Sequence, residues 1–200
     1  MRTFRTFLLA LALGCVAACS PRDFLTRRLA ADLISGNDTF SAPQVFWLRT
    51  GIVSNRDFSF PDTLVLQRRG WIIGTQQPKC PPGVDPPPCW DVVLSPAGVE
   101  TFRPLLPAGP QTGNLAPIRV AHRELVEVTG ISKVGNFAEV EFLWHWIPLN
   151  DVGSALYDSG VRYRSTVGFR SYDDGWRVIT EPMKNGQPLD EALSGARPAP

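Results

Sequence analysis

Alternating apolar and polar positions dominate the C-terminal half of the chain. In residues 137–147, FAEVEFLWHWI, Val140 and Phe142 alternate with Glu139 and Glu141. A period of two residues predicts a β-strand with one buried face. Strand-like patterns are found over residues 118–129, 137–147, 161–170 and 176–179. Because near turns join these segments, we expect an antiparallel four-stranded meander.

A helical pattern precedes these strands. Residues 23–34, DFLTRRLAADLI, carry apolar side chains at helical spacing, among them Leu29 and Leu33. The chain is therefore predicted to be α+β, with an N-terminal helix packed on a curved meander sheet. This element order, with aromatic-rich late strands, resembles the cystatin-like and nuclear-transport-factor-like folds. The resemblance implies an apolar pocket where the sheet wraps the helix.

The first twenty residues, MRTFRTFLLALALGCVAACS, have the organisation of an export signal. Arg2 and Arg5 precede an apolar run that is too short to span a bilayer. The run ends in Val16-Ala17-Ala18-Cys19, which resembles a bacterial lipobox. Cys15 fits that pattern less well, and an ordinary secretory signal is the alternative.

The lipobox resemblance implies a membrane anchor. Residues 1–18 would be removed and Cys19 would become the lipidated N-terminus, where several acyl chains give stable attachment. Ser20, rather than an aspartate, follows the lipidated position, which by resemblance to the sorting rule of Gram-negative envelopes favours the outer membrane, facing the periplasm. The membrane, reached through this lipid, is thus the first expected partner.

The charge and the length of the mature chain limit its possible partners and fold. Loss of residues 1–18 lowers the formal charge from +1 to −1, so no basic surplus is left for nucleic acid. The remaining 182 residues are enough to bury a core. We expect a signal peptide at residues 1–18 and a lipidated N-terminus with its helix at 19–39. An insertion at 40–117, a meander sheet at 118–181 and a flexible tail at 182–200 are expected to follow.

The insertion at residues 40–117 carries the two remaining cysteines. Its pattern predicts helix, strand, proline-rich loop, strand and helix, ending in a Pro/Gly-rich linker. Leu94-Ser95-Pro96-Ala97-Gly98 is typical of a helix start. It resembles the Leu-Thr-x-x-Gly helix start that follows the second wing strand of winged-helix regulators. Behind an export signal we interpret the segment as a winged-helix-like insertion, not as a DNA reader.

The loop KCPPGVDPPPCW holds Cys80 and Cys89 with eight residues between them. A zinc site needs more ligands than two thiolates, and a redox Cys-x-x-Cys motif needs two intervening residues. In an oxidising compartment the pair is most simply one disulfide. We therefore predict a Cys80–Cys89 staple whose rigid loop is a contact site only in second place.

Candidate chemistry is sparse. There is no G-x-S-x-G elbow and no Gly-rich phosphate loop, and the only histidines are His122 and His145. We expect no catalytic residue, no metal and no cofactor. A candidate pocket is formed by His122, Glu124, Trp144, Trp146 and Tyr163. The aromatic members are predicted to be mainly core, and Trp146 is the one nearest a strand end.

Two hypotheses of function follow. The first is a non-enzymatic envelope lipoprotein that binds a protein partner or an apolar ligand. The second is an enzyme with a pocket on the same fold, in which His122 and Glu124 act as acid and base. A cavity that reaches both side chains would favour the enzyme.

Overall fold

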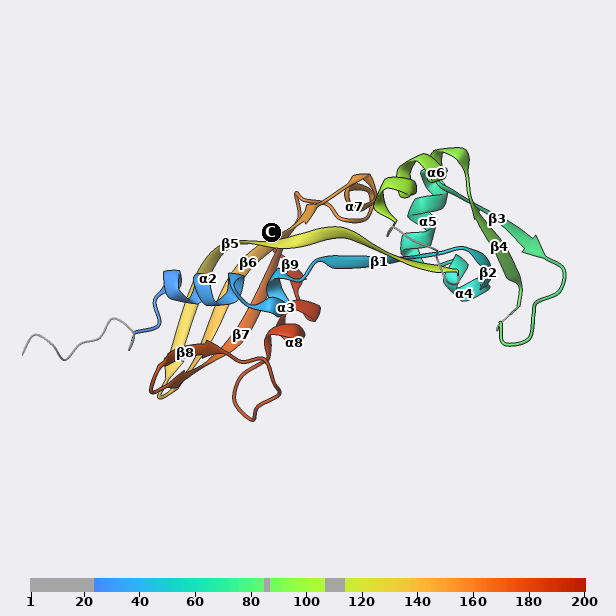
Figure 1. Ribbon diagram of the computed structural model, residues 1–200. Helices are drawn as coiled ribbons and strands as arrows, with labels where there is room; N and C mark the ends of the chain where they lie inside the picture. The colour runs from blue at the N-terminus through green and yellow to red at the C-terminus, as the bar shows by residue number, and fades with distance from the viewer. Residues whose placement is uncertain (1–23, 85–86, 107–113) are drawn as a thin grey trace, which may run out of the picture. The chain divides into compact units, whose positions relative to one another are not determined.

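The computed structural model describes residues 24–84, 87–106 and 114–200, which form two compact units (Figure 1). The described part of the first unit comprises residues 24–40, 125–143 and 163–198. The second unit comprises residues 41–124, with the gaps just given, 144–162 and 199–200. The predicted signal peptide at residues 1–18 and the predicted lipidation site Cys19 lie outside the described residues.

The first unit combines helices with the larger part of one sheet. Its elements, some shared with the second unit, are α2 (Arg27–Ser35), α3 (Asp38–Ser41), β5 (Leu115–Val134), β6 (Phe137–Pro148), β7 (Arg162–Tyr172), β8 (Gly175–Val178), α8 (Leu189–Ser194) and β9 (Arg197–Pro198). The α+β class with antiparallel strand pairs is thus confirmed.

Helix α2 starts later than the sequence pattern suggests. The hydroxyl of Thr26 accepts a hydrogen bond from the N–H of Leu29 at 3.1 Å, which fixes the N-terminus one residue before Arg27. Ala30 and Ile34, four residues apart, are fully buried on one face. The predicted range of 23–34 is therefore corrected to Arg27–Ser35, because the cap, not the apolar pattern, sets the first turn.

The main sheet has six strands within the described residues, not the four of the predicted meander. Its order is β1-β5-β6-β7-β8, and β9 also pairs with β7. The two strands that the prediction lacks come from distant segments: β1 (Gln44–Arg49) pairs with β5, and β9 pairs with β7 at Tyr163 and Arg164. Local alternation identifies strands but carries no record of such long-range partners.

Residues 182–200, expected as a flexible tail, contain α8 and β9. Leu189, Ala192 and Leu193 of α8 are buried. The N–H of Leu189 donates to the carbonyl oxygen of Ile179 at 2.9 Å. A few apolar side chains at helical spacing therefore hold this segment on the first unit.

The second unit is built on a smaller sheet in the order β2-β4-β3. Besides β1, its elements are β2 (Gly51–Ser54), α4 (Asn55–Phe58), α5 (Pro61–Arg68), β3 (Ile72–Gln77), β4 (Cys89–Leu94), α6 (Pro96–Phe102), η2 (Arg103–Leu105) and α7 (Asp151–Leu156). The predicted order of helix, strand, loop, strand and helix is confirmed by α5, β3, β4 and α6. A core that includes Leu66, Val92 and Phe102 holds these elements together.

Ser95 begins α6 as the sequence predicts. Its hydroxyl accepts from the N–H of Gly98 at 3.0 Å and donates to the carbonyl oxygen of Gly70 at 2.6 Å. Pro96 occupies the first turn, where its missing N–H costs nothing. Gly98 is required for close approach, because an added Cβ would overlap the backbone carbonyl of Trp71.

The predicted disulfide is confirmed. Cys80 and Cys89 are bonded, with their Cα atoms 5.6 Å apart, and they close the loop between β3 and β4. Cys89 is also the first residue of β4 and is fully buried. The staple therefore ties the loop directly to a strand of the second unit. In the part of the chain that the structure describes, no helix is long and apolar enough to cross a membrane.

Candidate binding pocket

A cavity of about 250 Å³ lies in the second unit, alongside β1. Its apolar lining comes from β1, β2, β3, β4 and α5, and includes Leu48, Val53, Leu66, Ile72 and Val92. These side chains also belong to the core of the unit. The cavity is therefore an opening into a packed core, with walls set by rigid elements.

Strand β1 lines this cavity with all six of its residues, Gln44–Arg49. Successive side chains of a strand point to opposite faces of the sheet. A cavity confined to one face would touch every second residue. Contact with six consecutive residues therefore means that the cavity opens along the hydrogen-bonding edge of the strand.

The opposite wall is formed around α4 and α5. The hydroxyl of Ser54 accepts from the N–H of Asp57 at 3.2 Å and donates to its carboxylate at 3.1 Å, so helix α4 starts with a closed cap. Thr63 then donates its hydroxyl to the carbonyl oxygen of Asp57 at 3.0 Å. These bonds lock the turn that presents Phe60 and Asp62 to the cavity.

Three charged side chains line the cavity, and only two of them pair with each other. Arg49 and Asp57 form an ion pair with a nitrogen–oxygen distance of 3.1 Å. Among the described residues, no hydrogen bond or ion pair satisfies the side chain of Asp62. Burial raises the pKa of the Asp62 carboxyl above its ordinary value of 3.8. The cavity thus carries one carboxylate that lacks a counter-charge within the described residues.

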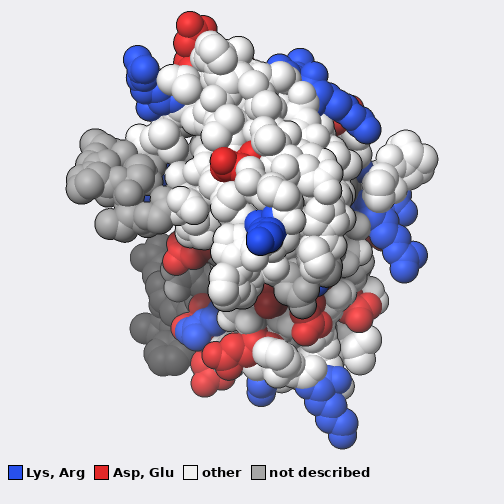
Figure 2. Space-filling view, turned by 90° about the vertical axis from the view of Figure 1, so that its right-hand side faces the viewer, with Lys and Arg blue, Asp and Glu red and all other residues white. Residues whose placement is uncertain are grey.

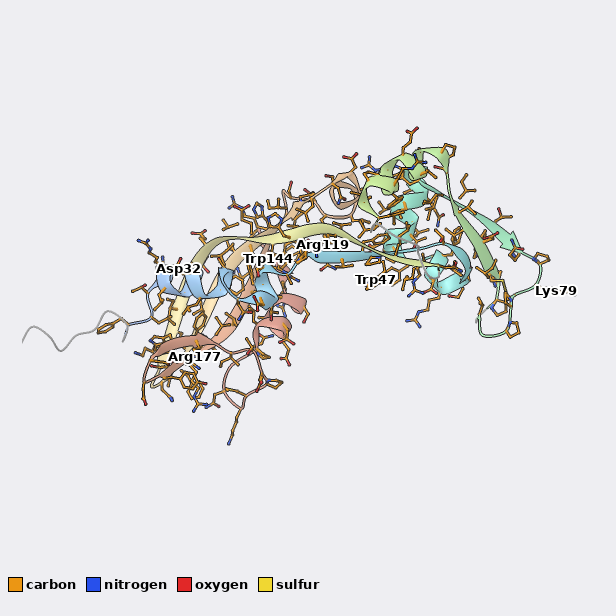
Figure 3. The ribbon with its side chains drawn as sticks, in the orientation of Figure 1. Asp32, Trp47, Lys79, Arg119, Trp144 and Arg177 are labelled. Carbon is orange, nitrogen blue, oxygen red and sulfur yellow. A yellow bond between two sulfur atoms is a disulfide. The ribbon has the colours of Figure 1, made fainter. Side chains whose placement is uncertain are left out.

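Aromatic rings surround the same opening. Phe46, Trp47, Phe60 and Tyr157 all line the cavity. Trp47 is 52% exposed and Phe60 is 56% exposed, although both are large apolar residues. Figure 3 labels Trp47, a residue of β1, on the second unit. Exposed aromatic rings next to an apolar cavity are typical of a binding surface.

A second hollow of about 330 Å³ adjoins the first and shares Arg49, Val53 and Asp57 with it. Gly83 and Val84 of the stapled loop line this hollow together with Asn114. A contact role for the stapled loop stays a prediction, and its residue Asp85 lies outside the described residues.

The small sheet of the second unit also exposes apolar side chains. Ile73 of β3 and Val93 of β4 lie directly opposite each other and are both about half exposed. Figure 2, which faces the side of Figure 1 where β2, β3 and β4 lie, shows few charged residues near the centre of the surface. Ile73 and Val93 therefore form an exposed apolar pair on the small sheet.

The residues of the candidate pocket predicted from sequence lie elsewhere. Neither of the two cavities described above is lined by His122, Glu124, Trp144, Trp146 or Tyr163. The carboxylate of Glu124 contacts His145 Nε2 at 3.4 Å, and His145 Nδ1 lies 3.1 Å from the carbonyl oxygen of Ser159. Tyr163 belongs to the first unit and the other four to the second. An acid–base role for His122 and Glu124 stays a prediction.

The tryptophans of that set are core residues, as expected. Trp144 and Trp146 are buried and meet edge to face, with centroids 5.2 Å apart. The guanidinium of Arg123 lies over both rings, 4.7 Å from the centroid of Trp146. Burial lowers the pKa of Arg123 from its ordinary value. Trp146, the predicted exception near a strand end, is as well covered as a core side chain and also contacts Tyr157.

Sequence reasoning missed the residues that line the observed cavity. Trp47, Phe60 and Asp62 lie in a stretch without clear periodicity. Two local signals were nevertheless present: Ser54 three residues before Asp57, and Pro61 at the first turn of a helix. These signals predict where the helices start, but they do not predict that the helices pack opposite β1.

Comparisons with known proteins add no relative. No protein-family model matches the chain, and neither the curated proteins nor the solved structures contain a significant match. The described residues contain no group of three or more His, Cys, Asp or Glu side chains placed to hold a metal ion.

Proposed function

We propose that this chain is a lipid-anchored lipoprotein of the bacterial envelope whose second unit is a non-enzymatic binding domain. Residues 1–18 act as its signal peptide, and Cys19 carries the lipid at the outer membrane. The sequence Val16-Ala17-Ala18-Cys19 behind a basic start supports the anchor. The Cys80–Cys89 disulfide agrees with an oxidising compartment.

The cavity along β1 is the observation that carries the binding role. It combines an apolar floor, exposed aromatic rings and an unmatched carboxylate, a composition suited to a ligand with an apolar body and a polar group. With about 250 Å³ it is smaller than the roughly 300–1,000 Å³ of pockets that enclose whole drug-sized ligands. It therefore accommodates a small molecule or one part of a larger partner.

We also propose how the two units are related to known folds. In this proposal the first unit is related to the cystatin-like and nuclear-transport-factor-like folds, and the order of α2 before the strands β5, β6, β7 and β8 supports it. The stapled hairpin between α5 and α6 corresponds to a winged-helix-like insertion. In this arrangement the insertion, not the meander, supplies most of the binding surface.

Binding is tested with a small probe that matches the cavity. We expect n-butylamine, an apolar stem with one cation, to shift backbone NMR signals of β1 and α5 in a saturable way. Thr63→Trp, which places a large ring at the cavity wall, should abolish the shifts. The matched control Thr166→Trp introduces the same ring on β7 of the first unit and should leave them unchanged. Saturable shifts that persist in Thr63→Trp would show that this cavity is not the binding site.

The anchor is tested separately. Mass spectrometry of the wild type should give the mass of acyl chains on Cys19, and the chain should fractionate with membranes. Cys19→Ala should lack both properties, whereas Cys15→Ala should keep them. A wild type without acyl mass refutes the anchor and leaves the binding role untouched.

A further inference from the structure

We propose that an extended peptide adds as a strand to the free edge of β1 and places one basic side chain in the cavity, against Asp62. This inference rests on the proposed binding role and specifies its ligand.

The edge of β1 is available for pairing. β1 ends the strand order of the main sheet, and among the described residues its only strand partner is β5. In an antiparallel pair, every second residue of an edge strand points its N–H and C=O away from the partner. These groups form the template that extended peptides use when they add to a sheet.

This edge also lacks the usual protection against pairing. Natural edge strands carry charges, prolines or bulges that hinder pairing with another strand. The sequence of β1, QVFWLR, contains no proline, and its one charge is at the last residue, Arg49. The register irregularity lies at its other end, between Gln44 and Val45. The central residues therefore offer a regular, uncharged edge.

The cavity lies where the side chains of an added strand would be. Because it touches six consecutive residues of β1, it follows the edge rather than one face. A peptide paired with this edge would place alternate side chains on the two faces of the sheet, next to the wall formed by Phe60, Asp62 and Thr63. Main-chain hydrogen bonds and a side-chain pocket would then be used by the same ligand.

Size and charge specify the side chain. About 250 Å³ is enough for one long side chain of a peptide but not for a bulky ligand. Arg49 neutralises Asp57, so Asp62 leaves one negative charge in excess at the site. A cation also binds favourably over the exposed rings of Trp47 and Phe60. A lysine or arginine satisfies the carboxylate, the rings and the volume together.

The experiment compares short peptides on the purified full-length protein by isothermal titration calorimetry. The first probe is acetyl-Thr-Val-Lys-Val-Thr-amide, which we expect to bind. A second peptide has norleucine for lysine, which keeps the stem and removes the charge. A third is N-methylated at alternate residues, which removes the main-chain donors. Each change should weaken binding at least tenfold, equal to about 1.4 kcal/mol.

Protein variants test the contribution of the Asp62 charge separately from that of the rest of the cavity. Asp62→Asn should weaken binding of the lysine peptide at least tenfold and leave the norleucine peptide unaffected. The control is Asp32→Asn on the exposed face of α2, in the first unit, which should change neither affinity (Figure 3). If the lysine peptide binds Asp62→Asn as tightly as it binds the wild type, Asp62 is not the partner of the lysine side chain.

The outcomes distinguish this inference from the proposed function. If n-butylamine binds the cavity and the N-methylated peptide binds as well as the unmodified one, strand addition is wrong and the binding role stands. If the amine binds and no peptide does, the peptide ligand is wrong. If neither binds, both proposals fail.

Discussion

Ser95 provides the sharpest test of how the second unit is held together. Its side chain is almost fully buried, with 6% exposed, and it makes two hydrogen bonds. Ser95→Ala removes the N-cap of α6, which costs about 1 kcal/mol. It also removes the hydrogen bond to the carbonyl oxygen of Gly70, an exposed residue, and the net contribution of such a bond is about 0.5–1.5 kcal/mol. The expected loss in free energy of unfolding is therefore about 1.5–2.5 kcal/mol.

The assay is urea unfolding together with hydrogen exchange at the Gly98 amide, which donates to the Ser95 hydroxyl. Thr26→Ala is the matched control, because Thr26 caps α2 with one exposed hydrogen bond and should cost only about 1 kcal/mol. A loss in Ser95→Ala no greater than that in Thr26→Ala would refute the claim that the second hydrogen bond contributes. Ser95→Thr keeps the hydroxyl and should retain most of the stability.

Three further outcomes are expected. Replacing Cys80 and Cys89 together by alanine should lower the free energy of unfolding by less than about 2.7 kcal/mol, the value for a loop of this length, because prolines already restrict the unfolded loop. Reductant should change the urea midpoint of the wild type but not that of the variant. Gly98→Ala should destabilise by at least about 1–3 kcal/mol because its Cβ overlaps a backbone carbonyl, whereas Gly130→Ala, with its nearest atom at 3.8 Å, should be tolerated; equal urea midpoints for the two would contradict this. Asp62→Asn should gain stability relative to the wild type as pH rises above 3.8, since the raised pKa of the carboxyl makes its ionised form the costly one in the fold; a difference in unfolding free energy that does not change with pH would refute this.

The fold shows where local patterns are informative. Helix α6 follows from Ser95-Pro96, and the Cys80–Cys89 bond follows from two cysteines in a chain that is predicted to be exported. Both depend on chemistry within a few residues of chain. The four alternating segments were likewise strands, because a half-buried strand needs period two wherever it lies.

The candidate site was predicted less well because it depends on distant partners. The aromatic alternation of residues 142–146 suggested a pocket, but Trp144 and Trp146 pack under the guanidinium of Arg123 as core. Burial and pocket lining produce the same apolar pattern, so the sequence does not separate them. The exposed Trp47, in contrast, has no signature beyond being a large residue in a short strand.

The sequence by itself predicted an export signal, and it determined the staple, the cap of α6 and the faces of the strands, since each depends on neighbours along the chain. The tertiary structure alone decided that β1 pairs with β5 at the end of the sheet and that α5 lies across a cavity from it. It also decided that Asp62 lacks a counter-charge in the described structure while Asp57 has one. Strand partners and charge pairs are set by which segments meet in space, and a local pattern carries no information about that meeting.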